Sequence, residues 1–123
     1  MSPNPTVLKI DGSTITRKEK SFAANLSAIR RLAKEISEAN VSQLILIHGE
    51  GSFGHPLAKQ YSINEGYCVE GARLLGFSKT QEATMTLNKF AVDPLIQNNI
   101  PMMMISPHSY IVTKSGRIAE MME

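Results

Sequence analysis

The sequence predicts an α/β fold, a mostly parallel β-sheet flanked by helices with a β-hairpin near the C-terminus. Two observations predict this class. Short apolar runs alternate along the chain with longer segments whose apolar residues recur at helical spacing. In addition, residues 44–47 are apolar at every position, which is typical of a strand covered on both faces in a parallel sheet.

The first part of the chain predicts two strands joined by a helix. Residues 6–10 form an apolar strand that ends at the polar turn of residues 11–13. A helix is predicted over residues 22–39, and a second strand over residues 43–48. The apolar stripe of this helix comprises Phe22, Leu26, Ile29, Ala33 and Ile36.

Two more helices are predicted after the second strand. The first spans about residues 51–60, because Pro56 is tolerated in a first turn, where backbone N–H groups lack partners anyway. Residues 61–73 are predicted to form a loop or lid. A long helix then starts at residue 76 or 78 and ends near residue 97, and Pro94 should kink or break it. Its apolar stripe comprises Phe77, Thr80, Thr84, Leu87, Ala91 and Leu95.

The last part of the chain predicts a third strand and a hairpin. Residues 101–106 are apolar almost throughout, as a buried strand would be. Residues 110–113 and 117–118 are separated by a short turn that contains a glycine, which predicts the hairpin.

Right-handed crossovers bring the carboxyl ends of parallel strands to one edge of a sheet, where ligands bind. The loops of residues 11–13, 49–55 and 106–108 follow the three predicted strands, so we expect them to converge there. For the third loop, the sequence favours neither of two interpretations: a plain turn, or a ligand contact through Ser106 or His108.

The glycine-rich run HGEGSFGH, which starts at His48, is the strongest candidate site. Gly49, Gly51 and Gly54 allow positive φ angles or close approach of the backbone to a ligand. Backbone N–H groups between a strand and a helix bind anions, usually phosphates. His55 follows on the same turn and is placed to donate a hydrogen bond to a phosphate oxygen. His48 is interpreted as structural, and a tight turn without a ligand is the alternative for the whole run.

Lys9 lies in a strand otherwise made of valine, leucine and isoleucine. Its ammonium group must therefore reach the surface or face a negative charge. Gly12, three residues later, favours a phosphate nearby, whereas an edge-strand lysine that prevents aggregation is the alternative. Lys18 lies in a polar run, and spacing alone does not single it out.

The composition limits the classes of function. The chain has 123 residues, enough for one domain, with 42% hydrophobic and 20% charged residues. A net charge of +2, four Phe, three Tyr and no Trp argue against nucleic-acid binding. The single cysteine, Cys68, excludes an internal disulfide and fits a reducing cytoplasm, which is the expected location. The sequence predicts no metal site, signal peptide or membrane-spanning run.

Two segments together resemble a known family. They are KIDGSTITRK at residues 9–18 and HGEGSFGHP at residues 48–56, and both are similar to the amino-acid kinase superfamily, in particular to isopentenyl phosphate kinases of the archaeal type. The resemblance continues at residues 76–81, 87–88, 100–101, 106–107 and 116–118. It implies the three-layer α/β/α sandwich of that superfamily, with the chain as its N-terminal portion.

The resemblance implies ATP-dependent transfer of a phosphoryl group to isopentenyl phosphate, giving isopentenyl diphosphate for isoprenoid biosynthesis, with Mg²⁺ as the accompanying ion. Lys9, Lys18 and His55 would be the catalytic residues, since phosphoryl transfer needs alignment and charge neutralisation. The implied nucleotide contacts are Lys9, Gly12, Ser13 and Lys18. The implied acceptor contacts are Gly49, Glu50, Gly51, Ser52, Gly54 and His55.

The sequence departs from the family's pattern in two ways. The family has a second glycine where this chain has Asp11, and a carboxylate repels phosphates unless Mg²⁺ intervenes or the side chain turns away. We also expect residues 1–123 to be a single acceptor-binding portion without the nucleotide-binding half, inactive alone. Exposed apolar surface would then favour a homodimer. The alternatives are a non-catalytic phosphate-binding relative and a superfamily kinase with another small acceptor.

Overall fold

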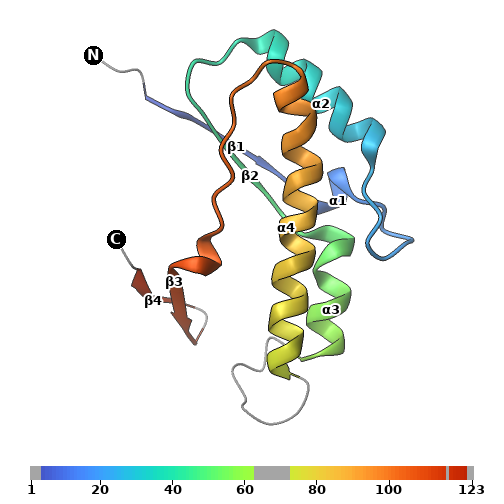
Figure 1. Ribbon diagram of the computed structural model, residues 1–123, viewed down its shortest axis with the longest axis vertical. Helices are drawn as coiled ribbons and strands as arrows, with labels where there is room; N and C mark the ends of the chain where they lie inside the picture. Colours follow the sequence, from blue (N-terminus) through green and yellow to red (C-terminus); the bar gives the residue numbers. More distant parts are fainter. Residues whose placement is uncertain (1–3, 63–72, 116, 122–123) are drawn as a thin grey trace.

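The structure is a computed structural model that describes residues 4–62, 73–115 and 117–121 (Figure 1). The elements are β1 (Thr6–Ile10), α1 (Gly12–Ile15), α2 (Leu26–Ala39), β2 (Leu44–His48), the 3₁₀ turn η1 (Gly51–Phe53), α3 (His55–Gln60), α4 (Arg73–Gln97), the 3₁₀ turn η3 (Pro107–Ser109), β3 (Ile111–Lys114) and β4 (Arg117–Met121). The α/β class, the parallel sheet and the C-terminal hairpin are confirmed. In the described ranges, no helix is long and apolar enough to cross a bilayer.

Strands β1 and β2 are parallel neighbours, paired from Thr6 with Leu44 to Ile10 with His48. One face of the pair lies against α2 and α4, where inward residues such as Leu46 are partly buried. On the other face, Val7, Ile45 and Ile47 are 60%, 48% and 46% exposed. The expectation that the second strand is covered on both faces is therefore wrong for the described chain, in which helices cover one face.

Helix α2 begins four residues later than the pattern predicts. Phe22 has a φ of 56°, a left-handed conformation that cannot continue into a helix. Its ring packs edge-on against Phe53, with the centroids 6.1 Å apart. Asn25 is the N-cap, and its side-chain oxygen accepts a hydrogen bond from the N–H of Ala28 at 3.3 Å. The helix ends at Ala39, and the C-cap residue that follows, Asn40, is also left-handed.

The predicted helix over residues 51–60 is divided into η1 and α3, with Pro56 in the first turn of α3 as expected. Helix α4 starts before residue 76 and runs unbroken to its end at Gln97 (Figure 1). The helix does not break at Pro94, which lies inside it in the last turn, and the other expected outcome, a kink, stays a prediction. The predicted loop at 61–73 falls mostly outside the described residues.

The third predicted strand does not form. Residues 101–106 pair with no strand among the described residues, and Met103 is 88% exposed. A strand needs a hydrogen-bonding neighbour, and apolar composition alone does not supply one. The hairpin of β3 and β4 is antiparallel, and Figure 1 shows it standing apart from the helices and from β1 and β2.

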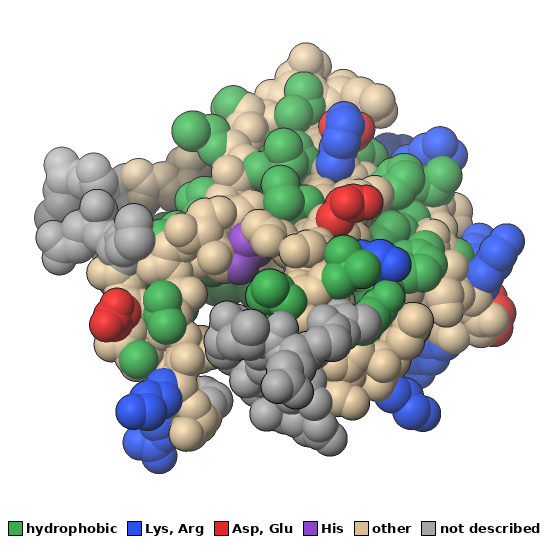
Figure 2. Space-filling view, turned by 60° about the horizontal axis from the view of Figure 1, so that its bottom comes forward, with side chains coloured by type: hydrophobic (Ala, Val, Ile, Leu, Met, Phe, Trp, Pro, Cys, Tyr) green, Lys and Arg blue, Asp and Glu red, His purple; other side chains and the backbone are tan. Residues whose placement is uncertain are grey.

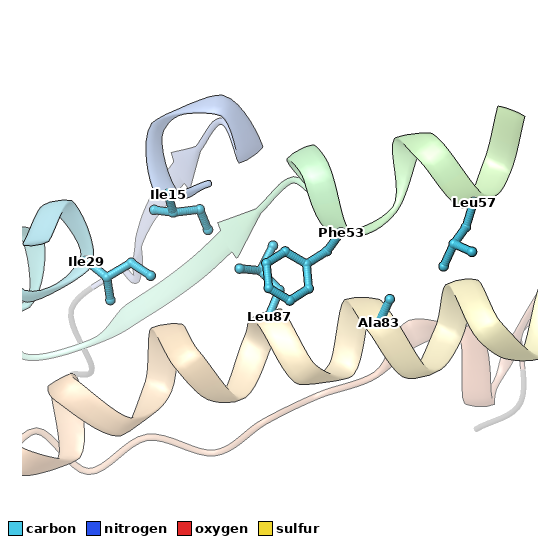
Figure 3. Packing of buried hydrophobic residues seen from close by; sticks show 6 residues of the cluster. All are labelled: Ile15, Ile29, Phe53, Leu57, Ala83 and Leu87. Carbon is cyan, nitrogen blue, oxygen red and sulfur yellow. The ribbon is translucent and has the colours of Figure 1, made fainter. Parts of the chain in front are cut away.

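The core lies between α4 and the loops that follow the two parallel strands (Figure 3). Leu87 and Ala83 of α4 lie beneath Phe53 of η1 and Leu57 of α3. The predicted stripe of α4 is confirmed at Leu87, which is fully buried. The core residues are Ile15, Ile29, Phe53, Leu57, Ala83 and Leu87. Figure 2 shows many other hydrophobic side chains on the surface of one side of the molecule.

Candidate functional site

A cavity of about 570 Å³ lies where β1 and β2 end. Two loops from distant parts of the sequence form its walls, the one after β1 and the one after β2, as the sequence predicts. Its lining residues are Lys9, Asp11, Gly12, Ser13, Thr16, Lys18, Ser21, Gly49, Gly51, Ser52, His55 and Pro56. The walls are therefore almost entirely polar or glycine.

The two loops touch through their backbones at glycines. A Cβ atom on Gly12 would overlap the nitrogen of Gly51 and would lie 2.8 Å from its Cα. A Cβ atom on Gly49 would lie 2.9 Å from the nitrogen of Gly12. Gly51 has a φ of 50°, a conformation that favours glycine. The predicted positive φ is confirmed at Gly51, and the close packing of the two loops is a further reason for glycine that the sequence did not indicate.

A buried hydroxyl joins the two loops. Thr16 is 3% exposed, and its Oγ1 donates a hydrogen bond to the carbonyl oxygen of Gly12 at 2.7 Å. The same oxygen accepts a hydrogen bond from the N–H of Ser52 at 3.2 Å. Sequence reasoning missed this residue, because a threonine inside a polar run carries no signal of a contact 36 positions away.

Most backbone N–H groups of the glycine-rich loop are already paired within the protein. The N–H of Gly49 donates to Ile10 at 3.1 Å, which continues the strand ladder. The N–H of Ser52 donates to Thr16, as described above. The remaining internal bonds run from Phe53 to Glu50 and from Gly54 to Gly51.

The expectation of a cradle formed by the whole loop therefore needs correction. In the described parts of the chain, the N–H groups of Glu50 and Gly51 have no such partner. The loop after β1 adds the N–H groups of Gly12 and Ser13, which begin helix α1 and so lack a partner within it. The free donors are fewer than the sequence suggests, and they come from both loops.

The ionisable side chains of the cavity are those of two lysines, one aspartate and a histidine. Lys9, from β1, and Lys18 give the lining a net charge of +1 once Asp11 is subtracted from the two cations (2 − 1 = 1). The His55 ring is 75% exposed, and its Nδ1 lies 3.6 Å from Oε1 of Glu50. An imidazole and two ammonium groups lining one cavity, together with unpaired N–H donors in the loops that form it, suit an anion with several oxygens.

Two of the residues predicted to bind the acceptor lie outside the cavity lining. The carboxylate of Glu50 pairs with His55, and its side chain packs against the backbone of Gly54. The third predicted loop does not join the cavity, because its strand does not form. Ser106 lines a separate groove along α4 instead. The described residues contain no group of three His, Cys, Asp or Glu side chains suited to a metal ion.

His48 is structural, as predicted, and links the site to the long helix. Its Nδ1 lies 2.8 Å from the carbonyl oxygen of Gly49, and its Nε2 lies 2.8 Å from the side-chain nitrogen of Asn88. Asn88 lies on α4, 40 positions away in the sequence. The sequence carries no signal that pairs these two residues.

Comparison with known proteins identifies the family. The profile of the amino acid kinase family matches residues 4–122. The chain is 38% identical over 119 residues to isopentenyl phosphate kinase of Methanothermobacter thermautotrophicus. This match covers 92% of the chain and 44% of the relative. It is 34% identical over 116 residues to isopentenyl phosphate kinase of Methanocaldococcus jannaschii, covering 87% of this chain and 45% of that relative.

Solved structures agree with these relatives. A crystal structure of isopentenyl phosphate kinase superposes with a TM-score of 0.84 at 37% identity, covering 94% of this chain and 49% of the other. A product complex of the Thermoplasma acidophilum isopentenyl phosphate kinase gives a TM-score of 0.77 at 26% identity, covering 94% and 47%. The chain thus spans about half the length of the proteins it matches. The resemblance seen in residues 9–18 and 48–56 is confirmed, and the chain belongs to the amino acid kinase family.

Proposed function

We propose that the protein to which this chain corresponds transfers the terminal phosphoryl group of ATP to isopentenyl phosphate, giving isopentenyl diphosphate. The observation that carries the proposal is the cavity at the ends of β1 and β2, which Lys9, Lys18 and His55 all line. The similarity to isopentenyl phosphate kinases supports the choice of acceptor.

In this proposal the residues of the cavity hold charge and position the reacting groups. Lys9 and Lys18 neutralise the transferring phosphoryl group, whose oxygens carry the charge of the transition state. His55 donates a hydrogen bond to the acceptor phosphate, and the N–H group of Gly51 donates another. The pair formed with Glu50 orients the His55 ring while leaving it accessible. No residue needs to form a covalent bond to the substrate.

The nucleotide part of the proposal depends on fewer groups. Gly12 and Ser13 present N–H groups beside Lys9, which suits the terminal phosphates of ATP. Mg²⁺ would neutralise the phosphates. Asp11 lines the cavity, and its carboxylate is a type of ligand that Mg²⁺ commonly binds. We propose that the remaining nucleotide contacts lie outside residues 1–123, since the chain spans less than half of its curated relatives. We also propose that the protein acts in the cytoplasm.

Binding and turnover test the proposal separately. The chain of residues 1–123 is expected to bind isopentenyl phosphate, measured by calorimetry, and to show no turnover with ATP and Mg²⁺. His55→Leu should weaken binding at least tenfold because it removes the donor to the acceptor phosphate, whereas His108→Leu, outside the cavity lining, should not. Equal affinity of both variants would contradict the assignment of the cavity.

A second candidate is a kinase of the same family with a different small acceptor. Dimethylallyl phosphate and inorganic phosphate are the comparison ligands. Preference for isopentenyl phosphate over both supports the first proposal, and equal binding of all three supports a site that recognises only the phosphate.

A further inference from the structure

We propose that His48 is a positioning residue, which keeps the peptide between Gly49 and Glu50 turned so that its N–H group, and not its carbonyl oxygen, is on the side of the candidate anion site. This inference rests on the proposed function, because the orientation matters only if the cavity holds an anion. His48 is not part of the cavity lining. It acts on the site through the backbone.

The hydrogen bonds of His48 determine which ring nitrogen carries the proton. The carbonyl oxygen of Gly49 can only accept, so Nδ1 of His48, 2.8 Å away, must donate. The neutral ring then has its lone pair on Nε2, which accepts from the side-chain nitrogen of Asn88 at 2.8 Å. The carbonyl oxygen of Gly49 therefore fixes the Nδ1–H form of the ring, which is the minor neutral form of free histidine in water, and the side chain of Asn88 supplies the matching donor to Nε2.

The planarity of the peptide bond carries this choice to the site. In a trans peptide, the carbonyl oxygen of one residue and the N–H of the next point in opposite directions. Because His48 holds the carbonyl oxygen of Gly49, the N–H of Glu50 must point away from the imidazole. The nitrogen of Glu50 lies 3.0 Å from the position of a Cβ on Gly12, so it borders the loop that follows β1.

The reversed peptide would be harmful to anion binding. Its carbonyl oxygen would lie where the N–H of Glu50 now lies, next to Gly12 and Gly51, which line the cavity. A carbonyl dipole pointed at an anion repels it, while an N–H donor attracts it. Glycine at position 49 removes one obstacle to such a reversal, since it has no Cβ, and the φ of −91° at Glu50 opposes it on the other side of the peptide. A locked imidazole prevents that reversal.

Two substitutions separate the roles of the two ring nitrogens. The side-chain nitrogen of asparagine occupies about the position of Nδ1 of histidine, and that of glutamine occupies about the position of Nε2. His48→Asn therefore keeps the donor to Gly49, and His48→Gln loses it while still reaching Asn88. Both variants lose the ring, so a purely structural role predicts similar effects for both.

The experiment uses residues 1–123 labelled with ¹⁵N and inorganic phosphate as the probe. A long-range ¹H–¹⁵N spectrum of the wild-type chain should show the His48 ring protonated at Nδ1. In phosphate titrations, the backbone amide signals of Glu50 and Gly51 should shift. We expect His48→Asn to bind within threefold of wild type and His48→Gln to bind at least tenfold more weakly, the loss of one donor to an anion. His108→Gln, an exposed histidine outside the cavity, is the matched control.

Asn88→Leu provides an independent readout if His48→Gln fails to fold. It leaves the imidazole in place and removes the donor to Nε2, so the ring loses one of its two hydrogen bonds and phosphate should bind more weakly. A wild-type ring protonated at Nε2, or equal phosphate affinity of wild type and His48→Gln, would overturn the inference. If the backbone amide signals of the wild-type chain shift with neither phosphate nor isopentenyl phosphate, the proposed function is contradicted instead. The ring spectrum then still tests whether His48 is protonated at Nδ1.

Discussion

Replacing Thr16 with valine tests whether one hydroxyl joins the two loops of the cavity. The substitution keeps the shape of the side chain and removes the hydroxyl. Thr16 as a residue is only 3% exposed. The carbonyl oxygen of Gly12 keeps the backbone N–H of residue 16 at 3.0 Å, so it stays paired. The N–H of Ser52 loses its only acceptor at 3.2 Å and stays buried.

The magnitude follows from that unpaired N–H group. A buried donor without an acceptor costs about 1–3 kcal/mol, so we expect the free energy of unfolding to fall by about 2 kcal/mol. For a chain of this length, the melting temperature should fall by roughly 8 °C. Urea unfolding followed by far-ultraviolet circular dichroism measures the first quantity, and a thermal scan measures the second.

Thr86→Val is the matched control for this substitution. The hydroxyl of Thr86 donates to the carbonyl oxygen of Glu82 at 2.9 Å on the exposed side of α4. Its removal should change the free energy of unfolding by no more than about 0.5 kcal/mol, because water replaces the lost partner. If Thr16→Val is as stable as Thr86→Val, the hydroxyl does not join the loops and the reasoning is refuted.

Two further predictions concern the same loops and the open sheet face. Gly51→Ala should abolish phosphate binding in a titration and lower the melting temperature, because a Cβ there would overlap Oγ1 of Thr16 and a φ of 50° disfavours alanine; an unchanged affinity would contradict this account. Residues 1–123 should self-associate through the face that bears Val7, Ile45 and Ile47, and Ile45→Lys should suppress this in sedimentation velocity, whereas a wild-type monomer at every concentration would refute it.

The sequence predicts those parts of the fold that depend on local pattern. Strands β1 and β2 follow from short apolar runs, the buried stripe of α4 from apolar residues at helical spacing, and the hairpin from its glycine-containing turn. The structure has them close to the predicted positions. The prediction of a third strand over residues 101–106 also depends on an apolar run, and it is wrong. Residues 101–106 have the composition of a strand, but pairing depends on a neighbour that composition does not describe.

The candidate site divides in the same way. The glycine-rich turn and Lys9 stand out in the sequence, because glycines and a strand lysine are unusual where they occur. The pairing of His48 with Asn88, and of Thr16 with Ser52, could not be predicted, since each joins ordinary polar residues 36 or 40 positions apart. The roles of Lys9, Lys18 and His55 in catalysis stay predictions.

The hairpin of β3 and β4 depends on its own backbone pairing, because β4 is exposed along its whole length and the pair stands apart from the helices (Figure 1). An isolated two-stranded ribbon is barely stable in water. Its amide protons are therefore expected to exchange with deuterium rapidly, through frequent local opening. Those of β1 and β2 are expected to exchange more slowly, because their exchange requires larger unfolding events. In energetic terms the chain consists of a cooperative body and a loosely coupled end, which can rearrange at little cost to the rest.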